Sequence, residues 1–254
     1  MDREKAFYIA VSISIILGTW WLTSGTIFHQ AILPSPPQVA ERFWEMIATA
    51  ELLFHLGISL KRILIGCVLG CSLGFIIGTS MGGIKLMKDI LEPPFQFFRN
   101  IPPVALVPLA ITVLGIGEIS KISVIVYITI LSMTLNCAAG MMSTPQIRIR
   151  AALCLGASRR DIFLRIVLPS AWPYILTGLR VAVGYSFMAV VAAEMIAAEK
   201  GIGFLIMQSI LIIHPREMVI GLILLGGLGL TGDRIFLMMI NRLMRRYMIT
   251  MKGA

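Results

Sequence analysis

The sequence predicts an all-α membrane protein with six transmembrane helices. Hydrophobic residues make up 57% of the chain and charged residues only 14%, and the mean hydropathy is +0.89. The surface of a soluble protein of this size needs far more charge. Crossing a bilayer takes about 20 mostly apolar residues. The predicted spans lie in residues 6–40, 63–84, 100–117, 122–147, 172–193 and 218–232.

The first apolar segment is interpreted as a retained span rather than a signal peptide. Arg3 and Lys5 form a basic flank, as they would before a signal sequence. The apolar run is too long for the hydrophobic region of a signal, and no small-x-small cleavage site precedes Leu33.

Residues 36–55 predict an amphipathic helix on the outer face. Val39, Phe43 and Met46 recur at helical spacing, while Arg42 faces elsewhere. This helix either braces the fold or forms part of a landing site for an external partner.

The second span carries glycines at every fourth position, which predicts a face where another helix approaches closely. They are Gly66, Gly70, Gly74 and Gly78. Cysteines in this and neighbouring segments are interpreted as small buried thiols.

The third span is irregular because Pro102, Pro103 and Pro108 each remove a backbone donor and kink or break a helix. Carbonyls freed in this way must be satisfied by protein or by a water-filled cavity. A broken helix at membrane depth indicates a translocation pathway. The alternative is a packing kink that touches no cargo.

Charges within the last two spans are further candidates for function. Arg180 either faces a cavity, as a cation for an anionic solute, or reaches the cytoplasmic interface. Glu194 ends its span and is expected at the outer rim, as a gate or an assembly contact. Asp233 and Arg234 are interpreted as an interfacial pair.

Residues 144–169 predict two short helices between the fourth and fifth spans. Thr144 and Pro145 suit the start of the first helix, and Gly156 suits the left-handed turn that ends it. Ser158 and Asp161 suit the start of the second. Pro169 is expected to stop it. Within the first helix, Ala151 and Ala152 leave a bare surface that another protein can approach closely.

This loop resembles the "EAA" coupling loop in the membrane subunits of ATP-binding-cassette importers, although Arg150 replaces the glutamate of the motif. Further matches follow the order of the nitrate/sulfonate/taurine branch. They are residues 33–37, 101–108, 115–121, 178–180, 193–195, 201–203 and 233–234. The resemblance assigns coupling to Arg150, Ala151, Ala152, Leu155, Gly156, Ala157, Ser158 and Arg159.

The resemblance implies a six-span permease subunit of a type-I importer for a small anion: taurine or another sulfonate first, nitrate or bicarbonate next. It implies as partners two cytoplasmic ATPase subunits, a second permease copy, expected as a homodimer, and an extracytoplasmic solute-binding protein. Residues 53–246 would form the permease core, after an N-terminal span and external segment in residues 1–52 and before a cytoplasmic tail in residues 247–254.

The sequence lacks the phosphate-binding loop G-x-x-x-x-G-K-[ST], so ATP and Mg²⁺ are expected in the partner ATPase and no cofactor in this chain. The three histidines are scattered, and no metal site is predicted. A secondary transporter or channel driven by an ion gradient is the alternative, but it calls for acidic or histidine relays and inverted repeats. A membrane anchor would leave the loop 144–169 unexplained.

The resemblance implies a bacterial inner-membrane location, and the distribution of basic residues predicts both termini in the cytoplasm. The net charge of +9 suits contact with anionic inner-leaflet lipids, and nothing in the sequence indicates a nucleic-acid partner. Lys61 and Arg62 fall on the outer side against this bias and are expected to snorkel to the interface.

Overall fold

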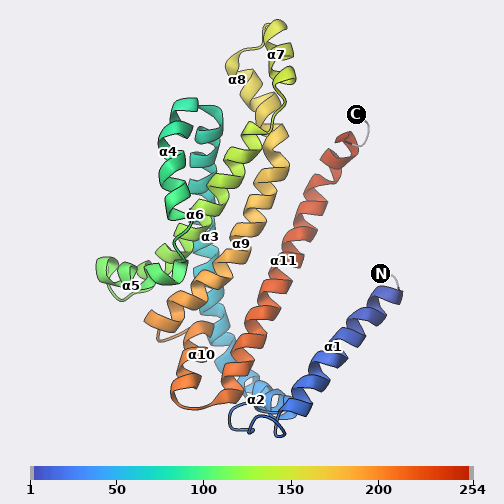
Figure 1. Ribbon diagram of the computed structural model, residues 1–254, viewed down its shortest axis with the longest axis vertical. Helices are drawn as coiled ribbons and strands as arrows, with labels where there is room; N and C mark the ends of the chain where they lie inside the picture. Colours follow the sequence, from blue (N-terminus) through green and yellow to red (C-terminus); the bar gives the residue numbers. More distant parts are fainter. Residues whose placement is uncertain (1–2, 252–254) are drawn as a thin grey trace.

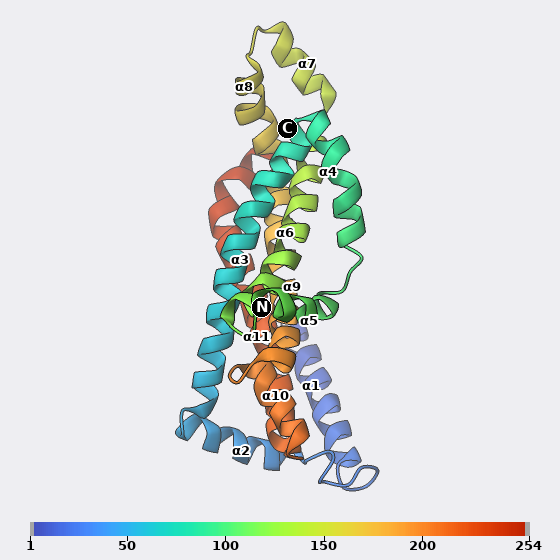
Figure 2. The same cartoon turned by 90° about the vertical axis from the view of Figure 1, so that its left-hand side faces the viewer.

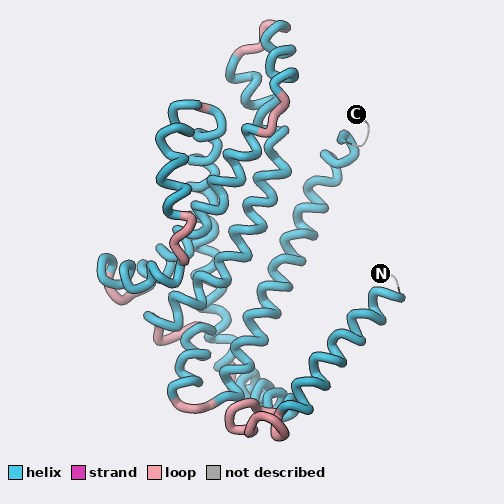
Figure 3. Tube along the Cα trace, in the orientation of Figure 1, coloured by secondary structure: helices cyan, strands magenta, loops and turns pink. Residues whose placement is uncertain are grey.

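Residues 3–251 are described by a computed structural model, in which helices are joined by turns and loops (Figure 3). Three long helices, α3 (Glu51–Gly83), α6 (Glu118–Met142) and α9 (Leu168–Ala197), pack side by side (Figure 1). The short helices α7 (Gln146–Cys154) and α8 (Arg159–Ile162) form one end of the molecule, called here the loop end. α2 (Pro36–Ala48) and α10 (Ile202–Leu211) form the opposite end, called the α2 end.

The described residues make an all-helical membrane protein with four or five candidate spans. Four helices are long and apolar enough to cross a bilayer: Glu51–Gly83, Glu118–Met142, Arg159–Ala197 and Pro215–Ile240. The bent pair α4 (Lys85–Phe98) and α5 (Pro103–Leu114) would be a fifth. The charge-free run 6–40 is not a single helix, because α1 (Arg3–Thr23) ends before a loop that leads to α2. Its apolar part, Phe7–Thr23, is shorter than the other candidate spans.

The third predicted span is built differently from expectation. α4 and α5 meet at an angle of 99°, and α5 crosses the direction of the bundle (Figure 2). The break falls just before Pro103, whereas Pro108 lies inside α5 without ending it. With 12 residues, α5 is about 18 Å long and too short to cross a bilayer core of about 30 Å. Residues 100–117 are therefore not a span by themselves.

The glycine face of the second span packs as predicted. A Cβ at Gly74 would lie 2.7 Å from Cβ of Met133, and one at Gly78 would lie 2.6 Å from Cβ of Cys137. Both contacts are with α6, so the absence of side chains lets the two helices approach closely. The Thr134 hydroxyl donates to the Gly74 carbonyl at 3.2 Å across this contact.

The predicted amphipathic helix is α2. It ends at Ala48 rather than at residue 55, and residues from Glu51 onward belong to α3. Val39 and Met46 are buried against Leu205 and Ile220, so α2 braces the α2 end of the fold. α11 (Pro215–Met251) runs from this end toward the loop end (Figure 1). It includes residues 247–251 of the expected tail, and residues 252–254 lie outside the described part.

Candidate functional site

The helix–turn–helix at the loop end has the local structure that its sequence predicts. Gly156 takes a left-handed conformation, with φ +79°. Its amide donates to the Leu153 carbonyl at 3.0 Å, and the Ala157 amide donates to the Ala152 carbonyl at 3.0 Å, which closes α7 in a Schellman motif. The Ser158 hydroxyl then caps α8 by accepting from the Asp161 amide at 3.2 Å.

Two expectations for this loop are wrong. Pro145 rather than Thr144 is the N-cap residue of α7, so the helix begins one residue later than expected. Pro169 does not stop the second helix, since helical structure runs without interruption from Arg159 to Ala197. A π-helical segment, Phe163–Val167, directly precedes α9, so the regular hydrogen-bond pattern is already altered where Pro169 lacks its amide, and the helix continues through it.

The two faces of α7 differ. Gln146, Ile149 and Leu153 face a cavity against the ends of α3 and α6. Ile147, Ala151 and Leu155 recur at every fourth residue on the opposite face, and we call them the α7 stripe. All three are exposed, and Leu155 is 88% exposed. Ala152 is half-buried and lies between the faces. The bare surface predicted at the two alanines is thus largely that of Ala151.

A cavity of about 550 Å³ lies where α4 and α5 meet, and we call it the central cavity. Arg99, Asn100, Pro102 and Pro103 line it from the break between the helices. Pro108 is not among its lining residues. The Phe98 carbonyl at the end of α4 accepts a hydrogen bond of 2.5 Å from the Tyr127 hydroxyl, so the break leaves this carbonyl satisfied.

Polar groups from α6 face the same cavity. Ser132 and Asn136 line it one helical turn apart, and Tyr185 contributes from α9. The Ser132 hydroxyl is buried and has no partner among the described residues. The Asn136 side-chain amide donates to the Ser132 carbonyl at 2.8 Å. None of the described lining residues is acidic. The cavity therefore offers a guanidinium, amides and a hydroxyl to a small solute.

Glu194 is enclosed rather than exposed at a rim. Its carboxylate pairs with Arg62 at 2.8 Å and accepts from the Ser59 hydroxyl at 2.8 Å and the Gly203 amide at 2.9 Å. A Cβ at Gly201 would collide with this carboxylate, so glycine lets the backbone close over it. The expectation that Arg62 snorkels to the interface is wrong, because the side chain is buried.

Arg180 is already paired within the chain. Its Nε donates to Asp233 Oδ1 at 2.5 Å and its Nη2 to Oδ2 at 2.8 Å, which joins α9 to α11. The expected partner of Asp233 was the adjacent Arg234. Side chains on one helix at consecutive positions do not face each other, whereas those on packed helices do.

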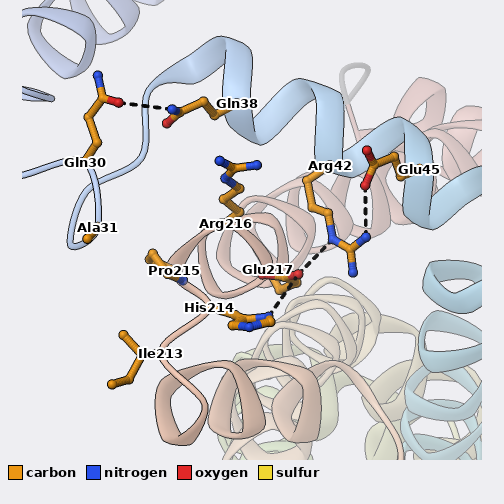
Figure 4. A pocket seen from close by; sticks show the side chains of 10 residues that line it. All are labelled: Gln30, Ala31, Gln38, Arg42, Glu45, Ile213, His214, Pro215, Arg216 and Glu217. Atoms are coloured by element: carbon orange, nitrogen blue, oxygen red, sulfur yellow. Dashed lines mark hydrogen bonds and ion pairs between the residues drawn. The ribbon is translucent and has the colours of Figure 1, made fainter.

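A second open cavity, of about 650 Å³, lies at the α2 end, and we call it the outer groove (Figure 4). Arg42 crosses it to Glu217 at 2.8 Å and to Glu45 at 2.9 Å, and these carboxylates raise the pKa of Arg42. Arg216 also lines the groove, and its side chain is exposed.

Comparison with known proteins decides the family. Residues 70–248 match the family described as the binding-protein-dependent transport system inner membrane component. The chain belongs to this family. It is an ABC transporter permease, the multi-pass membrane component of a transporter rather than its ATPase.

Relatives of this permease match it over most of its length. A probable ABC transporter permease protein of Brucella melitensis is 38% identical over 89% of this chain and 91% of its own. The taurine transport system permease protein of Escherichia coli is 35% identical over 82% and 78%. The nitrate import permease protein of Synechocystis is 35% identical over 91% and 86%.

A solved structure supports the fold of the permease. The MetNI methionine ABC transporter, in an inward-facing conformation, includes a chain that matches with a TM-score of 0.56. The match covers 70% of this chain and 91% of that chain at 19% identity.

Sequence reasoning missed the partners in the Glu194 network. Arg62 also binds both oxygens of Glu118, at 2.5 and 2.7 Å. A signal was present, because an arginine and a glutamate at the ends of apolar segments need partners where they are withdrawn from water. Which helices bring them together is set by the tertiary structure.

Proposed function

We propose that this permease imports a small anion, taurine or another sulfonate first and nitrate or bicarbonate next. The central cavity is the observation that carries the proposal. Arg99, Asn100 and Asn136 offer donors to it, and a guanidinium suits the paired oxygens of sulfonates and carboxylates. Two relatives are named as taurine and nitrate permease proteins, which supports a small anion as the solute.

Pro102 and Pro103 give the cavity its shape in this proposal. The break at these residues turns α5 away from α4, so that the polar groups of α6 are reached from the opened side. Arg180 and Glu194 act differently, since each is held by a partner within the chain. We assign them to holding helices together and the attraction of the anion to Arg99.

The α7 stripe is proposed as the contact through which conformational changes of the ATPase subunit, driven by ATP, reach the permease. Ile147, Ala151 and Leu155 would lie in a surface cleft of a cytoplasmic ATPase subunit, which binds ATP and Mg²⁺. Two such subunits would serve two permease copies in a homodimer. The exposed apolar side chains of α5, such as Leu109 and Val113, would lie near the contact between copies.

The proposed topology has six spans in a bacterial inner membrane. It counts α1 as one span and the bent pair α4 and α5 as another. The N-terminal end of α1 and the C-terminal end of α11 both point toward the loop end, so both termini would be cytoplasmic (Figure 1). The outer groove would then face an extracytoplasmic solute-binding protein.

Reconstitution in liposomes with the ATPase and binding protein tests the proposal. We expect uptake of labelled taurine or another small anion that requires ATP, and no hydrolysis by the permease alone. Arg99→Gln should lower uptake by about tenfold or more, because one hydrogen bond to a charged group contributes about 1.5–3 kcal/mol. Lys88→Gln, on α4, which ends just before Arg99, lies outside the cavity lining and is the matched control.

Two results would contradict the proposal. Uptake driven by an ion gradient without ATP would favour a secondary transporter. Unchanged anion uptake in Arg99→Gln would show that the solute does not pass through the central cavity.

A further inference from the structure

The cavity behind α7 is the second place where a buried polar group lacks a partner. This cavity, about 520 Å³ in volume, lies between α7 and the ends of α3 and α6, and we call it the α7 cavity. Thr144 is 3% exposed, and its hydroxyl finds no hydrogen-bond partner among the described residues. A buried hydroxyl without a partner costs free energy, so it indicates a ligand at this position.

The lining of the α7 cavity has one polar and one apolar part. Arg159 and Gln146 line the same cavity as Thr144 and contribute a guanidinium and an amide. No described carboxylate lies within ion-pair distance of Arg159, and no described lining residue is acidic. Met141, Ile149 and Phe163 make up much of the rest of the wall. This combination fits an anion joined to a hydrocarbon chain.

The position of the α7 cavity selects the class of ligand. α6 ends at Met142 and α3 at Gly83, so the cavity lies where two candidate spans stop. Lipid phosphates lie at this level of a bilayer. Basic pockets at the cytoplasmic ends of transmembrane helices bind the headgroups of anionic lipids.

We propose that the α7 cavity binds an anionic phospholipid of the inner leaflet. The phosphate accepts from Arg159, Gln146 and the Thr144 hydroxyl, and an acyl chain lies against Met141 and Phe163. The leaflet rests on the proposed function, which places α7 in the cytoplasm. The lipid occupies the inner face of α7, opposite the α7 stripe, so it supports the helix from behind while an ATPase subunit contacts the stripe.

Lipid retention by the full chain tests the site. The purified protein is exchanged into detergent, and native mass spectrometry measures binding of added phosphatidylglycerol and, separately, phosphatidylethanolamine. We expect wild type to bind phosphatidylglycerol more tightly. Arg159→Gln should weaken that binding about tenfold or more, and Thr144→Val severalfold, because each loses a hydrogen bond to a charged group.

Matched variants separate the site from general effects. Arg160→Gln removes a neighbouring exposed charge that does not line the cavity. Thr79→Val removes a hydroxyl that already donates to the Phe75 carbonyl. Both should bind lipid as wild type does. Thr144→Ser keeps the hydroxyl and should retain lipid binding. If Thr144 acts only by packing, loss of its methyl group in Thr144→Ser should weaken lipid binding.

Three results would overturn the proposal. Equal binding of the two lipids would show that the headgroup charge is not recognised. Displacement of phosphatidylglycerol by glycerol phosphate at similar concentration would identify a site for free phosphates. Unchanged lipid binding in Thr144→Val, with weaker association of the ATPase, would identify a protein contact. Because retention is measured on the isolated chain, failure here leaves the transport proposal standing.

Discussion

Arg62 and Glu194 form a buried ion pair between α3 and α9, with Nη1 and Oε1 2.8 Å apart. Their side chains are 4% and 0% exposed. Arg62 also donates to the Lys200 carbonyl at 2.7 Å, and the Gly203 amide donates to Glu194. One pair thus joins α3, α9 and the turn into α10.

Removing one member of this pair should destabilise the permease more than removing both. Arg62→Met leaves the buried Glu194 carboxylate without a cation, and losing such a partner costs about 3–5 kcal/mol. Glu194→Met leaves Arg62 only the largely exposed Glu118 as a partner. The double variant Arg62→Met/Glu194→Met should recover part of that loss. Thermal unfolding in detergent measures the effect. Lys61→Met, at the exposed neighbouring position, is the control and should unfold as wild type does. Additive losses in the double variant would contradict the coupling.

Gly156→Ala should loosen the end of α7 without disturbing the bundle. A side chain in the left-handed conformation costs about 1–2 kcal/mol, and no atom of the described residues lies within 4 Å of the added Cβ. The bundle should therefore keep its melting temperature, while binding to the ATPase weakens by roughly tenfold. Gly117→Ala, at an extended and equally open position, is the control. If Gly156→Ala binds the ATPase as tightly as wild type, the turn has no role in coupling.

Gly78→Val should separate α3 from α6. Its Cβ would lie 2.6 Å from Cβ of Cys137, a contact with side-chain and backbone atoms that cannot move freely. Overpacking of this kind costs about 1–3 kcal/mol or more. Gly57→Val lies on the same helix, where no atom approaches within 4 Å, and should be much milder. The difference in melting temperature between these two variants is the measurement. Equal losses would mean that helix propensity, rather than the close approach, decides.

Exchanging the charges of Arg180 and Asp233 should restore what either single change removes. Arg180→Asp and Asp233→Arg each place like charges together between α9 and α11, whereas the double exchange rebuilds an ion pair. Assembly and transport should fall in both single variants and partly return in the double. Because the side chains are 46% and 36% exposed, the stability effect should be smaller than at Arg62. No return of transport would instead support a direct role for Arg180 with the solute.

The sequence by itself determined the features that depend on neighbouring residues. Apolar runs free of charge predicted a helical membrane protein, and Gly156 and Ser158 predicted the turn that closes α7 and opens α8. Glycines at every fourth position predicted the contact face of α3. Each follows from backbone geometry or helical spacing, which a short stretch of chain specifies.

Tertiary structure alone decided which distant groups meet. Arg62 and Glu194 are 132 residues apart, and Arg180 and Asp233 are 53 apart, so neither pair has a local signature. The same holds for Pro102 and Asn136 at the central cavity. Pro169 shows the opposite case: proline usually ends a helix, but here the helix continues through it, directly after a π-helical segment. Local preference is weak beside packing, and packing is fixed only when the helices come together.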